Sequence, residues 1–223
     1  MTMIMGMLCS KEEKSDEKAL VMATDSMASD PERFGKNDTI QKLFRVGDNI
    51  VLRAGSAHLS AHAIQSLQEM GNLSPSQAAE HLIHSTEKMY KQSPWPLQNS
   101  CIYLVGGMGS DLELYNVNTV FMHPENTRPG APITPTSFEV AGSAQEPIQA
   151  YMQGSHDAGK NLGYGLQSVA DALTLAHDFG QKGARNLGVN DKLQFGIITH
   201  DTGISRLYHP QVNLDSRTGY EYM

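Results

Sequence analysis

Cysteine is scarce in this sequence, and its scarcity argues against a disulfide framework. The 223 residues contain two cysteines, Cys9 and Cys101, each within an apolar segment. Such usage is typical of a reducing cytoplasm, where free cysteines are mostly buried. We therefore expect both to be buried thiols rather than nucleophiles. A chain of this length can form a core without disulfides or a structural metal.

Long apolar runs and an excess of basic residues are also absent. No run approaches the roughly 20 residues of a membrane-spanning helix, so we expect a soluble, cytoplasmic protein. The apolar residues 1–9 lack a basic leading segment and a small-residue cleavage site, so we expect no export signal. The net charge is -7, which disfavours nucleic acid as a partner, because such binding depends on Lys and Arg that neutralise phosphates.

No internal repeat or low-complexity linker divides the chain, so we expect one domain over residues 1–223, with 209–223 as a candidate C-terminal extension. Apolar patterns predict strands at 2–9, 19–25, 40–46, 49–55, 101–106, 111–117, 137–142, 193–199 and 205–209. Helices are predicted at 56–70, 75–91, 144–159 and 164–183, with Ser74 as the second N-cap. The proline-rich stretch 124–135 is predicted to be a loop. This order favours an α+β domain with two antiparallel sheets, each covered on its outer side by a helix pair.

The candidate chemistry begins with Thr2, which becomes the N-terminal residue if Met1 is removed. A free α-amino group titrates near pH 8, so it can accept the proton of a neighbouring hydroxyl at neutral pH. A nearby lysine would lower the pKa of that amine and stabilise the alkoxide, and a carboxylate would hold the lysine. Lys42 and Asp25 are the candidates, and Gly55 could supply a backbone N–H for the oxyanion.

Each of these residues also has a simpler interpretation. A threonine near a chain terminus is commonly inert. Asp25 could be a turn or capping residue, and Lys42 could be a surface lysine. The residues taken singly leave both interpretations open.

Three segments together resemble the proteasome β subunits and their bacterial relatives. VMATDSMAS (21–29) resembles a small-residue strand that ends in Asp-Ser, and IQKLFRVGDNIVLRAGSAH (40–58) resembles the following lysine, strand and Ala-Gly pair. VAGSAQ (140–145) resembles the Gly-Ser that opens the third helix. The resemblance in element order covers nearly the whole chain, and it implies an N-terminal nucleophile (Ntn) hydrolase fold, a four-layer αββα sandwich.

The resemblance also implies roles for individual residues. Thr2 would be the nucleophile, Lys42 the cation that lowers its amine pKa, Asp25 the partner of Lys42, Gly55 the oxyanion donor and Ser143 a support for the amine. At the position of a further supporting aspartate of the family, this chain has Asn186, with Asp191 nearby. An asparagine can hydrogen-bond but carries no charge.

Arg53 stands two residues before Gly55, where the family places a residue facing the side chain that precedes the scissile bond. This position predicts a preference for acidic or polar side chains, because a guanidinium pairs well with a carboxylate. The alternative is that Arg53 pairs within the protein.

The resemblance further implies a threonine endopeptidase acting on peptides or unfolded proteins within stacked homo-oligomeric rings, with an ATP-dependent unfoldase as a candidate partner. No cofactor and no metal are expected. Two alternatives remain: an inactive ring-forming scaffold, and an Ntn hydrolase of small amides.

Other motifs give little support to a different chemistry. His58 with His62 and His81 with His84 have helical spacing, but no HExxH motif accompanies them, so a metal site is not favoured. The glycines at 106, 107 and 109 are followed by a strand rather than a helix, which favours a hairpin over a nucleotide-binding loop.

Overall fold

The computed structural model describes residues 2–13, 15–26, 41–92, 101–119, 136–142, 144–182, 193–199 and 205–208. These residues form nine strands and four helices, all at predicted positions. Both sheets are antiparallel, so the predicted α+β class with two antiparallel sheets is confirmed. None of the four helices is long and apolar enough to cross a membrane.

The first sheet has five strands in the order β7-β1-β2-β8-β9. They comprise β7 (Phe138–Gly142), β1 (Met3–Ser10), β2 (Lys18–Asp25), β8 (Leu193–Thr199) and β9 (Ser205–Tyr208). Because β1 and β2 are consecutive antiparallel neighbours, the start of β1 lies beside the end of β2, with Ile4 opposite Thr24. This register brings the beginning of the described chain to Asp25.

The second sheet has four strands in the order β3-β4-β5-β6. They are β3 (Leu43–Val46), β4 (Asn49–Gly55), β5 (Cys101–Met108) and β6 (Leu112–Thr119). The predicted strand 40–46 begins three residues later than expected, at Leu43, and Lys42 directly precedes it. Lys42 therefore lies immediately before the first strand of this sheet.

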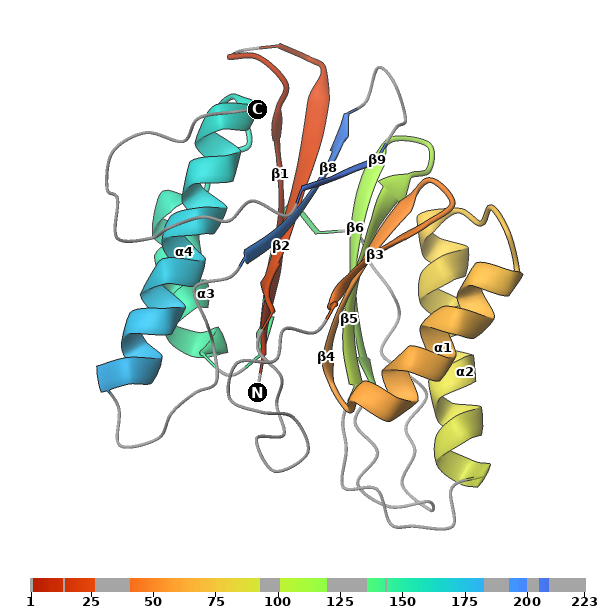
Figure 1. The fold of residues 1–223 in the computed structure, drawn as a ribbon. Helices are drawn as coiled ribbons and strands as arrows, with labels where there is room; N and C mark the ends of the chain where they lie inside the picture. The colour runs from red at the N-terminus through yellow and green to blue at the C-terminus, as the bar shows by residue number, and fades with distance from the viewer. Residues whose placement is uncertain are drawn as a thin grey trace.

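The helices lie on the outer faces of the two sheets (Figure 1). Helices α1 (Ala57–Glu69) and α2 (Pro75–Gln92) pack on the four-stranded sheet around Leu67, Leu82 and Tyr103. Helices α3 (Gln145–Ser155) and α4 (Leu162–Lys182) pack on the five-stranded sheet. A third apolar cluster, which includes Leu20, Ile50 and Leu104, fills the space between the sheets. The arrangement is compatible with a sandwich.

Two helix boundaries differ from prediction by two residues or more. The predicted helix 144–159 ends at Ser155, since His156 is extended and the Asp157 side chain accepts a hydrogen bond from Gly159 N–H in the following turn. Helix α4 begins at Leu162, two residues earlier than predicted, and the Asn161 side chain accepts a hydrogen bond from Tyr164 N–H. The N-cap predicted at Ser74 is confirmed, because its hydroxyl accepts a bond from Gln77 N–H.

Candidate active site

A buried ion pair joins the two sheets. Asp25 is the last residue of β2, and its Oδ2 lies 2.8 Å from Lys42 Nζ. The side chains are 0% and 2% exposed. Transfer of two charges from water costs several kcal/mol per ion, and a close partner offsets only part of it. A pair this deeply buried is therefore a candidate functional element.

The second carboxylate oxygen of Asp25 holds the start of β1. Met3 N–H donates to Asp25 Oδ1 over 2.9 Å. The Thr24 hydroxyl lies 2.9 Å from Met3 O and 3.0 Å from Asp25 O, so it can donate to either carbonyl. Thr2, which is 4% exposed, directly precedes this anchored residue. Asp25 thus fixes both the cation and the chain segment that carries Thr2.

Thr2 and Lys42 line one small pocket with residues of the β4–α1 junction: Arg53, Ala54, Gly55, Ala57 and Ser60. Asp25, which is not part of this lining, binds Lys42. The fold therefore brings together four of the sequence-predicted residues, Thr2, Lys42, Arg53 and Gly55, although they are distant in sequence.

Opposing effects act on the pKa of Lys42. Burial lowers its pKa, the charge of Asp25 and the hydrogen bond to it raise that pKa, and the charge of Arg53 lowers it further. Burial weakens solvent screening, so a charge beside Thr2 acts more strongly than it would at the surface. A positive charge here would favour both an unprotonated amine and a developing alkoxide.

Gly55 lies at the strand-to-helix turn that the sequence predicts. It ends β4 with φ +90°, a conformation that side-chain-bearing residues rarely adopt. Ser56 caps α1, with its hydroxyl accepting from Leu59 N–H, and Ala57 starts the helix at the pocket. A helix N-terminus favours negative charge, which suits an oxyanion.

Arg53 makes the internal contacts that the alternative interpretation predicts. Its guanidinium donates to Ala57 O at 2.9 Å, Ser60 Oγ at 3.0 Å and Gln41 O at 3.1 Å. It also lies 5.2 Å from the centre of the Phe44 ring, and burial lowers its pKa. These bonds hold Arg53 in the lining of the pocket. The preference for acidic or polar substrate side chains stays a prediction.

Two residues near the site, Thr24 and Gln194, were missed by sequence reasoning, and Gly142 was noted only as part of the Gly-Ser pair of the resemblance, without a role of its own. Gly142 has φ +124°, and a Cβ there would lie 1.9 Å from Thr2 O, so only glycine fits. Gln194 accepts hydrogen bonds from the backbone N–H groups of Lys42 and Leu43. The signal for Gln194 was a polar residue within the apolar strand LQFGIIT. Nothing in the sequence pattern distinguished Thr24.

Several predicted positions lie outside the described residues: Met1, Ser143, Asn186 and Asp191, together with the segments 124–135 and 209–223. Their predicted roles stay predictions. The described part of the site is therefore the pocket around Thr2, with the ion pair, Gly55 and Arg53.

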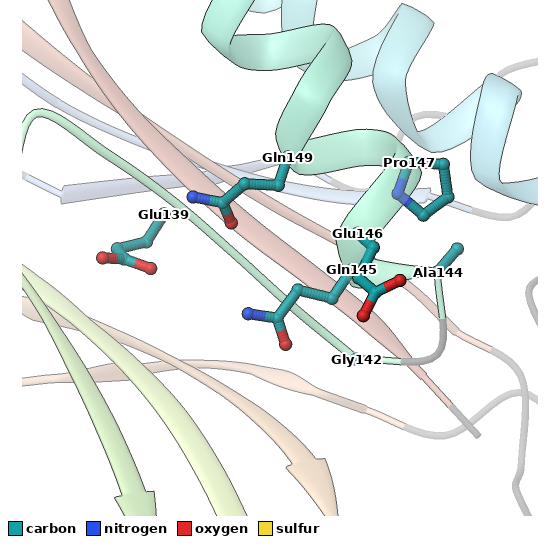
Figure 2. A pocket seen from close by; sticks show the side chains of 7 residues that line it. All are labelled: Glu139, Gly142, Ala144, Gln145, Glu146, Pro147 and Gln149. Atoms are coloured by element: carbon teal, nitrogen blue, oxygen red, sulfur yellow. The ribbon is translucent and has the colours of Figure 1, made fainter.

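A larger cavity of about 660 Å³ opens beside β7 and the start of α3 (Figure 2). Its lining includes two carboxylates, Glu139 and Glu146, and two amides, Gln145 and Gln149. Burial raises the pKa of Glu139, which accepts a hydrogen bond from Asn116. This lining includes neither Thr2 nor Lys42. We place the candidate site at the smaller pocket because Thr2 and the buried Lys42 line it together.

His58, His62 and His81 contact other groups of the protein, and both cysteines are buried. His58 and His62 contact each other edge-on at 4.8 Å, and His81 Nε2 lies 3.0 Å from the hydroxyls of Ser66 and Ser85. Within the described ranges, no group of three or more His, Cys, Asp or Glu side chains could hold a metal ion. Both cysteines are buried and free, as predicted. Burial raises the pKa of Cys9 to about 12 and that of Cys101 to about 11, so neither is an activated nucleophile.

Comparisons with models of protein families and with curated proteins found no match.

Proposed function

We propose that this protein is a threonine peptidase of the Ntn-hydrolase type, in which Thr2 becomes the N-terminal nucleophile once Met1 is removed. The observation that carries the proposal is the buried Asp25–Lys42 pair, with Thr2 and Lys42 lining one pocket and the second oxygen of Asp25 bound to Met3 N–H. A charge pair that served stability alone would gain little from burial. Its position beside a buried threonine favours a catalytic use.

The proposed reaction is acyl transfer. The α-amine of Thr2 takes the proton from Thr2 Oγ as this oxygen attacks the peptide carbonyl carbon, and the Lys42 ammonium stabilises the oxygen's developing charge. The oxyanion forms against the Gly55 N–H. The amine then returns the proton to the leaving nitrogen as the C–N bond breaks, which leaves an ester on Thr2. Water hydrolyses this ester and regenerates the hydroxyl.

Two antiparallel sheets with helices on their outer faces support the finer assignment of a four-layer αββα sandwich. We propose that copies of the chain form stacked homo-oligomeric rings around the sites, and that the substrates are peptides or unfolded proteins. An ATP-dependent unfoldase would supply these substrates. These assembly and partner proposals rest on the sequence resemblance alone.

The decisive experiment combines intact-mass analysis with a peptide-epoxide or peptide-boronate probe. The expected result is loss of Met1 and one adduct on Thr2, no adduct with Thr2→Ala, and a retained adduct with Thr2→Ser. The serine variant is the matched control because it keeps the hydroxyl on an equally small side chain. Native mass spectrometry of the same samples measures the number of subunits in the assembly.

A retained Met1 with no adduct under any condition would contradict the proposal and favour the inactive scaffold. An adduct with turnover of small amides but not of peptides would instead favour the small-amide hydrolase. An adduct that persists with Thr2→Ala would show that another residue is the nucleophile.

A further inference from the structure

The buried ion pair depends on residues from different sheets. Asp25 ends β2 of the five-stranded sheet, whereas Lys42 directly precedes β3 of the four-stranded sheet. A lysine ammonium stands on a flexible four-carbon stem, so an ion pair alone fixes it poorly. The position of the Lys42 ammonium therefore also depends on what holds the Lys42 backbone.

Gln194 connects that backbone to the sheet that carries Asp25. It is the second residue of β8, and it lies opposite Thr24 in the β2–β8 pairing, next to the Asp25–Leu193 pair. Its Oε1 accepts from Lys42 N–H at 3.0 Å and from Leu43 N–H at 3.1 Å. These two bonds match the two lone pairs of an amide oxygen.

The backbone of Lys42 is thereby held from both sides. Its carbonyl accepts from Arg53 N–H at 3.0 Å, which ties it to β4, while Gln194 ties its N–H across to β8. Gln194 is 6% exposed, so its bonds are screened from water. The five-stranded sheet thus holds Lys42 at two points, the N–H through Gln194 and the ammonium through Asp25.

We propose that Gln194 is a positioning residue, which fixes the Lys42 ammonium beside Thr2 by holding the Lys42 backbone to β8. The inference rests on the proposed function of Thr2 and Lys42. Gln194 acts through Lys42 and does not line the Thr2 pocket. A misplacement of about 1 Å at a catalytic group can lower a rate by about 100-fold. The two hydrogen bonds from the Lys42 and Leu43 amides to Gln194, which anchor this backbone, therefore matter for catalysis as well as for folding.

The test replaces Gln194 with methionine, which has a similar length but no strong acceptor. We expect Gln194→Met to lower the maximal rate of epoxide adduct formation on Thr2 by tenfold or more, with less than a twofold change in the probe concentration at half-maximal rate. Gln194→Glu keeps an acceptor oxygen at the same reach, and we expect it to recover part of the lost rate.

Asn49 provides the matched structural control. It is equally buried, and its side chain donates to Leu73 O at 2.8 Å at the opposite end of β4 from Gly55. Asn49→Leu also removes a part-buried side-chain hydrogen bond to the backbone. We expect it to lower thermal stability while its adduct rate stays within twofold of wild type. A rate loss equal to that of Gln194→Met would mean that general destabilisation explains both, and would overturn the inference.

Amide hydrogen exchange tests the anchor independently of activity. The Lys42 and Leu43 amides should exchange slowly in the wild type and at least tenfold faster in Gln194→Met, with no such change in Asn49→Leu. Fast exchange of both amides in the wild type would overturn the inference even if Gln194→Met did not fold.

The two proposals can fail separately. If the wild type, with Met1 removed, forms no adduct, the proposed function fails, and the positioning role for catalysis fails with it. If the wild type reacts but Gln194→Met folds and reacts at the same rate, the positioning role alone is wrong.

Discussion

Among the described residues, Lys42 has an environment that is unusual for its type. Lysine is almost never fully buried unless it is paired, and here its side chain is 2% exposed and contacts Asp25. The Lys91–Glu87 pair on α2 has a comparably short contact, 2.6 Å, but its lysine side chain is 55% exposed. The two pairs offer a direct comparison between a buried and an exposed lysine in one protein.

We expect Lys42→Met to destabilise the protein by about 3–5 kcal/mol, because the Asp25 carboxylate stays buried without its cation. Lys91→Met should change stability by less than about 1 kcal/mol, because water screens an exposed pair. Urea unfolding at pH 7 measures both. Equal effects of the two substitutions would show that Lys42 is not held in a costly buried pair.

At the scale of elements, the ends of three strands meet at Thr2. Strand β1 starts beside it, β2 ends at Asp25, and β7 ends at Gly142, which pairs with Met3. Gly142 has φ +124° and no room for a Cβ, because Thr2 O would lie 1.9 Å away. The convergence of these strand ends, together with the Asp25 carboxylate that accepts from Met3 N–H, sets the position of Thr2.

We expect Gly142→Ala to destabilise the protein more than Gly71→Ala and to slow probe labelling of Thr2. Gly71 also has a positive φ, +81°, but a Cβ there would meet no atom within 4 Å. Its substitution should therefore cost only backbone strain, about 1–3 kcal/mol. Urea unfolding and adduct rate are measured for both variants. Similar losses in both would argue against a close approach between Gly142 and Thr2.

At the scale of the whole molecule, the two sheets pack closely enough to place Lys42 against Asp25. Gly106 on β5 faces the other sheet, and a Cβ there would lie 2.4 Å from both Leu20 Cδ2 and Met22 Sδ. Gly196 on β8 has a similar position, because a Cβ there would lie 2.6 Å from Ile50 Cδ1. Glycines thus allow the inter-sheet core to be thin at these points.

We expect Gly106→Ala to destabilise the protein by about 1–3 kcal/mol, because the added methyl group overpacks the space between the sheets. Gly154→Ala is the control, since this glycine lies in α3 with no atom near its missing Cβ. Alanine should stabilise that helix by about 0.5–1 kcal/mol. Thermal unfolding should therefore shift in opposite directions, and a shift of the same sign would contradict the tight inter-sheet packing.

Local patterns predicted elements better than they predicted boundaries or partners. Alternating and helical apolar spacing located all the described strands and helices, because burial on one face imposes the period of the element. Helix ends were missed where a side chain such as Asn161 supplied the cap. Gln194 was missed because its partners, the backbone N–H groups of Lys42 and Leu43, carry no sequence signal.

The sequence by itself determined the mixed α+β class, the order of the elements, the burial of both cysteines and the choice of Thr2, Asp25, Lys42, Gly55 and Arg53 as site candidates. Only the tertiary structure decided that Asp25 and Lys42 form a buried pair, that Thr2 lies in the same pocket as Lys42, and that Arg53 is bound internally. The physical reason is that local periodicity reflects which face of an element is buried. Distances between side chains on different sheets are instead set by strand register and inter-sheet packing, which involve residues far apart in the chain.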